Sequence, residues 1–183
     1  MLHLSVSRRD DLAERATDYA LEHGLIGLSL RPLAAALDTS DRMLNYHFGS
    51  KDALIATVLA VSTERSMATI RAMPASPSVR QAILDLWDTF TQPAMARCQR
   101  MYVEAASLGL FGREPYAASV RDSNAVWLAA IAAHLQSSGA SKAKAPRLAT
   151  LVDATLNGLL LDRPLDGDAV TRRVVTDLAD ALG

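Results

Sequence analysis

The chain has 183 residues with 19 basic and 20 acidic side chains, which gives a formal net charge of −1. Half of its residues are hydrophobic, which is enough to bury a core and excludes a wholly disordered chain. Nine glycines, seven prolines and one cysteine exclude a collagen-like or disulfide-stapled chain. The single Cys98 has no partner within the chain, so we expect a reducing compartment.

The longest stretch without a formal charge, Ser123–Ser141, is not typical of a membrane span. Its continuous apolar run is only Ala125–Ala133, which is too short to cross a bilayer. The first residues of the chain lack the long apolar region of a secretory signal. We therefore expect a cytoplasmic protein that does not bind a membrane.

Apolar residues recur at spacings of three and four, and runs with a period of two are almost absent, so an all-α fold is expected. Serine caps and glycine stops predict four helices before the break at Pro74–Pro77. They are Arg8–His23, a helix capped by Ser29, a short helix over about Ser40–His47, and a long helix capped by Ser50. Five more are expected over Ser78–Thr91, Pro93–Leu110, Pro115–Ser138, Ala143–Leu161 and Asp168–Leu182, which makes about nine in all.

Residues 29–48 contain a helix of about eight residues, a turn at Asp38-Thr39-Ser40 and a second short helix. This length pattern is typical of a helix-turn-helix, although an ordinary αα-hairpin has the same pattern. The second helix is expected to bury Met43, Leu44 and Phe48 and to expose Ser40, Asp41, Arg42, Asn45 and Tyr46. In a major groove, an Arg side chain pairs with guanine and an Asn side chain pairs with adenine.

The stretch SLRPLAAALDTS, followed by DRMLNYHFGSKDALI, resembles the tetracycline-repressor (TetR) family of transcriptional regulators. The resemblance covers residues 12–59, and the run Tyr46–Lys51 is a strong signature of the family. It implies a helix-turn-helix domain over residues 1–49 and an effector-binding and dimerisation domain over residues 50–183, connected by the helix from about residue 50 to residue 73. It also implies that Arg31, Tyr46, His47 and Lys51 contact the DNA backbone, while Thr39, Ser40, Arg42 and Asn45 face base edges.

Two features of the N-terminal domain are unusual for a DNA-binding domain of the TetR family. Asp38 stands where the family usually has glycine, and we expect the turn to form because Asp tolerates a left-handed backbone. Residues 1–60 also carry more acidic than basic side chains, whereas a DNA-binding domain normally presents a basic face. Most of the acids lie on the first helix, so DNA binding with modest non-specific affinity is expected.

In the TetR family the rest of the chain binds a ligand and forms a dimer, so the resemblance implies a small-molecule effector and a homodimer. Aromatic, methionine and polar side chains are the candidates for the effector pocket, with an ordinary core role as the alternative for each. They are Trp87, Phe90, Met101, Tyr102, Glu104, Asn124 and Trp127. The candidates for the dimer interface are side chains at helical spacing on the last two helices, with burial inside one subunit as the alternative. They are Leu148, Leu151, Val152, Thr155, Leu156, Leu159, Val170, Val174 and Leu178.

The sequence has no His and Cys spacing of a metal site and no glycine-rich phosphate loop, so no metal, cofactor or catalytic residue is expected. The function expected is that of a transcriptional regulator, specifically a repressor released from double-stranded operator DNA by a small molecule. One alternative is a small-molecule-binding helical protein whose DNA reader no longer works. A weaker alternative is a helical enzyme that uses Cys98 or His134.

Overall fold

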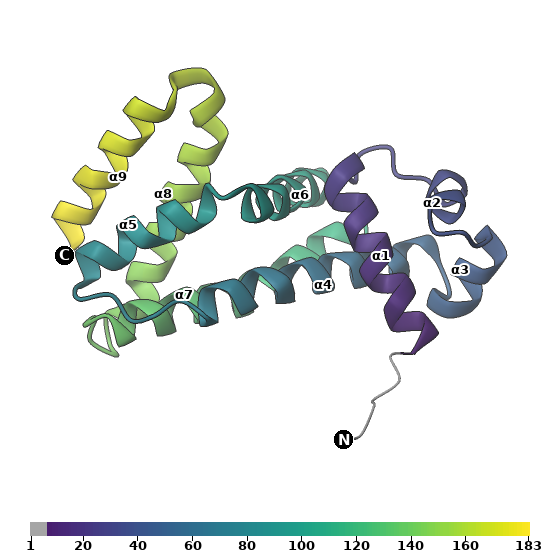
Figure 1. The fold of residues 1–183 in the computed structure, drawn as a ribbon, viewed down its shortest axis with the longest axis horizontal. Coiled ribbons are helices and arrows are strands. Elements are labelled where there is room, and N and C mark those ends of the chain that lie inside the picture. The colour runs from purple at the N-terminus through teal and green to yellow at the C-terminus, as the bar shows by residue number, and fades with distance from the viewer. Residues whose placement is uncertain (1–6) are drawn as a thin grey trace. The chain divides into compact units, whose positions relative to one another are not determined.

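The computed structural model describes residues 7–183, and within this range the protein is built of nine helices (Figure 1). They are α1 (Arg8–His23), α2 (Leu30–Ala36), α3 (Asp41–Phe48), α4 (Lys51–Arg71), α5 (Val79–Phe90), α6 (Pro93–Leu110), α7 (Tyr116–Ser137), α8 (Ala145–Asp166) and α9 (Asp168–Leu182). No strand occurs in this range. The prediction of an all-α fold is confirmed.

The helix ends follow the chemistry that the sequence indicates. The hydroxyl groups of Ser40, Ser50 and Ser78 each accept a hydrogen bond from the backbone N–H three residues later. These bonds satisfy N–H groups that have no partner inside the first turn of a helix. Gly24 and Gly49 end α1 and α3 at φ angles of 83° and 84°, where a side chain would be strained.

The end of α8 differs from the prediction. The sequence places a break before Pro164, but the helix continues through this proline and ends at Gly167, whose φ is 83°. A proline inside a helix removes one backbone hydrogen bond but does not always end the helix. An ion pair of 2.5 Å between Arg163 and Asp168 spans the end of α8. Because the helix passes through Pro164, the expected break at this position is wrong.

The chain divides into two compact units. The first contains the residues up to 65 and residues 100–123, and the second contains residues 66–99 and 124–183. The helices α4, α6 and α7 therefore contribute residues to both units. The first unit therefore includes parts of α4, α6 and α7, and the expected functional boundary at residue 49 stays a prediction.

In the first unit, α1 turns an apolar face toward the interior. The residues of α1 that face the interior include Leu12, Ala16 and Ala20. The short helix α2 lies against both α1 and α3. Each short helix buries only two side chains, which are Leu33 and Ala34 in α2 and Leu44 and Phe48 in α3.

By length and composition alone, α4 is apolar enough to cross a membrane. A core helix meets the same criterion. The side chains of Leu54, Ile55 and Val58 on α4 are almost fully buried in the protein. We therefore interpret α4 as a core helix.

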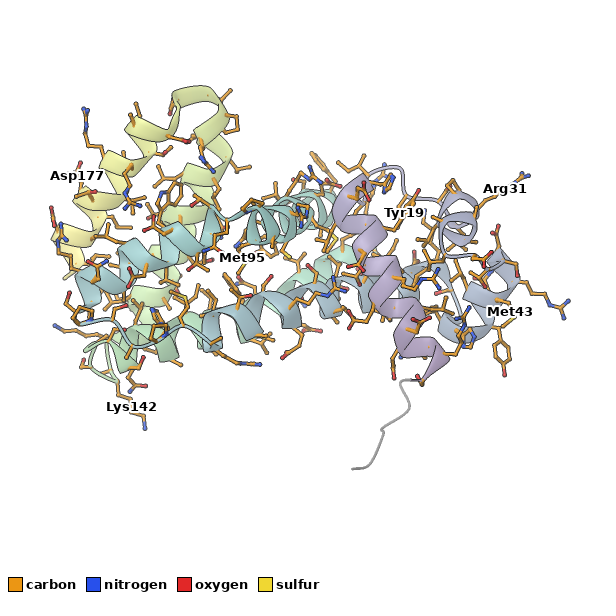
Figure 2. The ribbon with its side chains drawn as sticks, viewed as in Figure 1. Tyr19, Arg31, Met43, Met95, Lys142 and Asp177 are labelled. Carbon is orange, nitrogen blue, oxygen red and sulfur yellow. The ribbon has the colours of Figure 1, made fainter. Side chains whose placement is uncertain are left out.

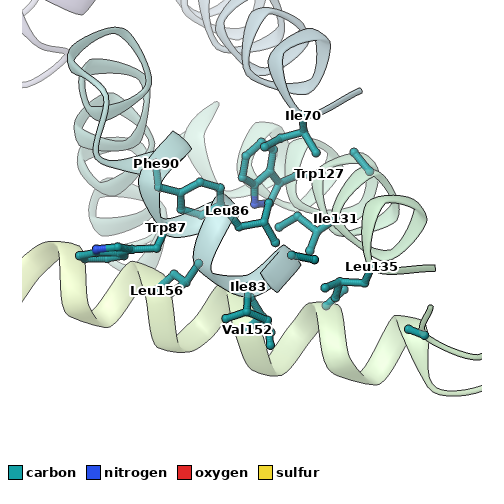
Figure 3. Packing of buried hydrophobic residues seen from close by; sticks show 14 of the residues in the cluster. Ile70, Ile83, Leu86, Trp87, Phe90, Trp127, Ile131, Leu135, Val152 and Leu156 are labelled. Carbon is teal, nitrogen blue, oxygen red and sulfur yellow. The ribbon is translucent and has the colours of Figure 1, made fainter. Parts of the chain in front are cut away.

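The second unit has a larger apolar core, which Figure 3 shows from close by. Both α5 and α8 pack against α9. The rings of Phe90 and Trp127 lie at the centre of this core with their centroids 5.4 Å apart. The indole N–H of Trp127 donates a hydrogen bond of 2.7 Å to Asp153, and burial raises the pKa of the Asp153 carboxyl.

Candidate nucleic-acid interface

The turn between α2 and α3 is a tight helix C-cap. The N–H of Thr39 donates to the carbonyl of Ala34 at 2.9 Å, and the N–H of Asp38 donates to the carbonyl of Ala35 at 3.2 Å. This pair of bonds is a Schellman motif, and its left-handed position is occupied by Asp38 with a φ of 52°. The turn therefore forms with Asp38 in the conformation that usually requires glycine.

Two arginines of α1 hold the short helices in place. Arg15 donates to the carbonyl of Leu37, at the end of α2, at 2.7 Å. Arg9 donates to the carbonyl of His47, near the end of α3, at 3.3 Å, and its guanidinium lies 5.2 Å from the centre of the Phe48 ring. Both arginines neutralise the partial negative charge at a helix C-terminus. Spacing in the sequence does not reveal these roles, because the partners lie 22 and 38 residues away.

The outward face of α3 is larger than predicted. Leu44 and Phe48 are buried as expected, but Met43 is 42% exposed, so its expected burial is wrong. An eight-residue helix buries only one narrow side, and Met43 lies about 100° around the helix from Leu44. Tyr46 is 78% exposed, as predicted. Figure 2 shows the Met43 and Arg31 side chains projecting outward from α3 and α2.

The residues expected to contact DNA share this surface or its edges. Arg31, Arg42, Asn45 and Lys51 are exposed, whereas Thr39 and His47 are half-buried. Ser40 accepts the N–H of Met43, so its hydroxyl oxygen already caps α3. In the described part of the chain, the side chains of Arg31, Arg42 and Lys51 form no ion pair.

The acidic residues of α1 are largely engaged within the protein. Arg65 of α4 pairs with both Glu14 and Asp18, the second pair at 2.6 Å. Asp11 pairs with Arg8 and Arg15, at 3.2 and 3.7 Å. These acids therefore oppose DNA binding less than a count of residues indicates. Arg31 of α2, Arg42 of α3 and Lys51 of α4 are thus left without an acidic partner among the described residues.

A second set of polar contacts ties α6 to the end of α1. Glu104 accepts the backbone N–H groups of Leu25 and Ile26 at 2.6 and 3.0 Å. Its carboxylate is so close to Gly24 that a Cβ atom there would lie 2.9 Å from each oxygen. One turn earlier on α6, Arg100 donates to the carbonyl of Leu21 at 2.8 Å. We call this set of contacts the α1–α6 clamp.

The candidate effector residues fall into separate groups. Trp87, Phe90 and Trp127 belong to the apolar core of the second unit (Figure 3), and Asn124 is half-buried in that unit. In the first unit, Met101 and Tyr102 line a cavity of about 20 Å³ together with residues of α4 and α7. This volume holds about one water molecule. Glu104 is part of the α1–α6 clamp.

An open groove of about 420 Å³ lies on the second unit, and Trp87 contributes to its wall. The groove also contains two ion pairs, which Arg172 forms with Asp88 and Arg163 forms with Asp168. Both arginines are therefore neutralised by acids of the same groove.

The candidate dimer residues divide by exposure. Val152 and Leu156 are fully buried within the subunit and are thus used by its own core. Leu148, Leu159 and Leu178 are partly buried against that core, and Thr155 is half-buried. Leu151, Val170 and Val174 remain exposed to solvent.

The described residues contain no group of His, Cys, Asp and Glu side chains that would hold a metal ion. Cys98 is half-buried, and His134 is buried with its Nε2 atom lacking a hydrogen-bond partner.

Comparison with known proteins agrees with this geometry. Residues 12–58 match the sequence model of the bacterial regulatory proteins of the tetR family. The fold is similar to that of a transcriptional regulator from Rhodococcus sp. Rha1, with a TM-score of 0.77, 21% identity and 96% of each chain covered. No curated protein matches the chain by sequence.

Two of the similar structures contain small molecules. One is a transcriptional regulator from Saccharomonospora viridis in complex with choline, with a TM-score of 0.69, 17% identity, and 95% of this chain and 96% of that chain covered. The other is the multidrug binding protein EbrR complexed with proflavin, with a TM-score of 0.67, 23% identity, and 94% of this chain and 99% of that chain covered. At these identities the similarity concerns the fold.

The helix-turn-helix and its matched sequence are those of a DNA-binding transcriptional regulator. The match to the bacterial regulatory proteins of the tetR family covers residues 12–58, which include α2, α3 and most of α1.

Proposed function

We propose that the protein is a cytoplasmic, homodimeric repressor that binds operator DNA through α3 and leaves it when a small-molecule effector binds. The observation that carries DNA binding is the outward face of α3, where Arg42, Asn45 and Tyr46 are exposed above a fixed turn. The unpaired Arg31 and Lys51 flank this face and suit the phosphates on either side of a major groove. A two-fold dimer would place two such helices about 34–36 Å apart, one turn of DNA.

Fluorescence anisotropy with duplex DNA selected from a random pool tests this proposal. The wild-type protein is expected to bind the selected duplex more tightly than a scrambled one at about 150 mM salt, because specific contacts add to the phosphate contacts. Replacing Arg42 and Lys51 together by alanine should lower this affinity about 100-fold or more, since a bidentate base contact alone contributes about 1–3 kcal/mol.

The matched control replaces Lys144 and Arg147 by alanine, because both are exposed and lie at the start of α8. This double variant loses the same two charges and should bind like the wild type. Equal losses in the two double variants would contradict reading through α3. If no sequence is selected, the DNA reader does not function, and the protein is a small-molecule-binding helical protein.

Exposed apolar side chains on α8 and α9 support the homodimer. Along α8 they alternate at spacings of three and four, the spacing of a helix that packs against another helix. The stripe consists of the exposed Leu151, Ala154, Leu161 and Leu165 and of the half-buried Gly158 between them, and Val170 and Val174 of α9 are also exposed. A Cβ atom at Gly158 would meet nothing within 4 Å, so the subunit itself does not require glycine there. A glycine inside a helix costs about 0.5–1 kcal/mol relative to alanine, and close approach of a second helix would explain it.

Sedimentation equilibrium of Leu161→Asp tests the dimer. Leu161 is 56% exposed within the subunit, so the change should leave the fold intact and convert the dimer to a monomer. Leu110→Asp is the control, because Leu110 is an exposed leucine outside the stripe, and it should remain a dimer. A wild-type protein that sediments as a monomer at all micromolar concentrations would contradict the proposal.

The candidate effector site is the cavity beside Met101 and Tyr102, because α6 connects it to the end of α1. The same helix α6 carries these two side chains and also Arg100 and Glu104 of the α1–α6 clamp. The cavity is too small for an organic molecule, so ligand entry must displace the helices that line it. A displaced α6 would pull on the end of α1, which supports α2 and α3. Similar proteins bind choline in one structure and proflavin in another, which favours a small organic molecule as the effector.

A cavity-filling substitution tests this coupling without knowledge of the effector. Ser119 of α7 lines the cavity, so Ser119→Phe should force the surrounding helices apart and lower operator affinity at least tenfold. The exposed neighbour Ala118 supplies the control Ala118→Phe, which should bind DNA like the wild type. Unchanged affinity of Ser119→Phe, with a helical content equal to that of the wild type, would contradict the coupling.

A further inference from the structure

The side chain of Met43 occupies an unusual position for an apolar residue. It lies on the third residue of α3, and its backbone N–H is held by the hydroxyl of Ser40 at 3.3 Å. The side chain is 42% exposed, whereas Leu44 beside it is 1% exposed. Figure 2 shows Met43 projecting outward from α3. Contacts within the subunit thus fix the backbone of Met43, but they bury only part of its side chain.

The neighbours of Met43 place it within the face that would enter a major groove. Arg42 and Tyr46 are separated by one helical turn and lie opposite the buried Leu44. Met43 lies between them in the sequence and three residues from Tyr46, so the two large side chains are adjacent on the helix surface. In helix-turn-helix proteins the N-terminal residues of the reading helix contact the base edges. Met43 belongs to this part of α3.

We propose that Met43 is a specificity-determining residue that recognises the 5-methyl group of a thymine in the operator. The inference rests on the proposed function in DNA binding. A methionine side chain has no hydrogen-bond donor and only a weak acceptor, so it is poorly suited to the polar edges of guanine, adenine or cytosine. The thymine methyl is the apolar group that a base pair presents in the major groove. The flexible, polarisable thioether suits contact with such a group.

The position of Arg42 extends this assignment. Its guanidinium is exposed, forms no ion pair with a described residue and is suited to bidentate bonding with guanine. Because Arg42 and Met43 are consecutive on the helix, the thymine contacted by Met43 lies close to the guanine contacted by Arg42. Each half of the operator is thus expected to contain a guanine and a thymine at neighbouring positions.

The experiment compares thymine with deoxyuridine, which differs only by the missing methyl group. Duplexes are selected from a random pool with the full-length protein, and each thymine of the selected site is then replaced in turn by deoxyuridine. Anisotropy titrations measure the affinity of each duplex. One substitution in each half-site should weaken binding about fourfold, as expected for the loss of one buried methyl-sized group.

Met43→Ala connects this loss to the side chain. The variant should bind the thymine duplex about as weakly as the wild type binds the deoxyuridine duplex, and it should no longer distinguish the two. Tyr46→Ala is the matched control, because it truncates the other exposed large side chain of α3. It should weaken binding but keep the dependence on the methyl group. Met43→Leu, which keeps an apolar side chain of similar size, should restore most of that dependence.

The outcomes separate this inference from the function on which it rests. If no sequence is selected, the proposed DNA reading fails as a whole. If a site is selected and deoxyuridine is tolerated at every position, recognition of a thymine methyl is wrong. If Met43→Ala retains the dependence while its circular dichroism spectrum matches that of the wild type, another residue recognises the methyl group.

Discussion

The short helices α2 and α3 and the long helices of the second unit keep their shapes by different means. Each short helix buries two side chains, and arginine side chains of α1 donate to the carbonyls at its end. The helices of the second unit instead share a continuous apolar cluster around Phe90 and Trp127. Polar bonds to the backbone thus replace apolar burial where a helix must keep most of its surface free.

This difference separates stability from recognition along the chain. The outward face of α3 contributes little to the folded subunit, so its substitutions should change DNA binding more than the free energy of unfolding. Substitutions in the core of the second unit should have the opposite balance. The following experiments test this separation, beginning with the largest expected effect.

Replacing a central core residue should give the strongest loss of stability. Phe90 is fully buried, and Phe90→Ala should lower the free energy of unfolding by about 3–5 kcal/mol. Tyr46→Ala removes a ring of similar size from the outward face of α3 and should change the same free energy by less than about 0.5 kcal/mol. Urea unfolding followed by circular dichroism measures both. Similar losses in the free energy of unfolding of the two variants would contradict the separation of stability from recognition.

The α1–α6 clamp tests whether polar bonds truly stabilise the first unit. Glu104→Ala leaves the N–H groups of Leu25 and Ile26 without their acceptor and should cost about 1–3 kcal/mol. Glu104→Gln keeps one carbonyl oxygen as an acceptor and should cost less. The same urea titrations give both values. If Glu104→Ala were as stable as the wild type, water would accept the two N–H hydrogen bonds as well as the carboxylate does, and the clamp would not stabilise the first unit.

The second unit should also respond to pH through a buried histidine. Burial lowers the pKa of His134, and its Nε2 atom has no hydrogen-bond partner. The unfolded chain therefore binds a proton near pH 6.5 that the folded chain does not bind, so stability should fall as the pH drops below 6.5. The negative charge of Asp85 raises the pKa of His134, but burial has the larger effect and lowers it.

Urea unfolding at several pH values between about 5 and 8, a range that brackets the ordinary histidine pKa, measures how the free energy of unfolding changes with pH. His134→Gln should have a flatter profile than the wild type. A slope that persists in the His134 variant would assign the pH dependence to another group.

The smallest expected effect lies in the turn before α3. Asp38 has a φ of 52°, so Asp38→Gly should relieve left-handed strain and stabilise the protein by up to about 1 kcal/mol. Asp41→Gly, within the first turn of α3, should instead destabilise the protein by about 1 kcal/mol. Thermal unfolding of the two variants gives the sign of each change. A loss of stability in Asp38→Gly would mean that the aspartate side chain itself holds the turn.

Local patterns predicted the helices well, because caps and stops act within a few residues. Ser40, Gly24 and Gly49 have the roles that their sequence neighbourhood indicates. The side of a short helix that becomes buried depends on the surface beneath it, and for this reason Met43 was misplaced. Hydrophobicity alone does not distinguish a core methionine from one kept outside.

Contacts between distant residues could not be predicted from one sequence. Glu104 is a polar residue on an amphipathic helix, and nothing near it in the chain indicates a partner 79 residues earlier. Pro164 misled the prediction of α8 in the opposite way, since a strong local signal did not end the helix. The assigned roles of the effector and dimer residues stay predictions, and exposure now separates those that a partner can reach from those that the subunit uses itself.

The contacts that hold α2 and α3 also have a consequence for synthesis on the ribosome. Arg15 and Arg9 reach partners 22 and 38 residues further along the chain, whereas the bond from Leu25 to Glu104 spans 79 residues. Segments near the N-terminus generally fold first as a chain emerges. The nascent protein can therefore complete its reading helix while α6 is still being made. Every new molecule would pass through a period in which α1, α2 and α3 have been made but the segment of α6 that restrains α1 has not.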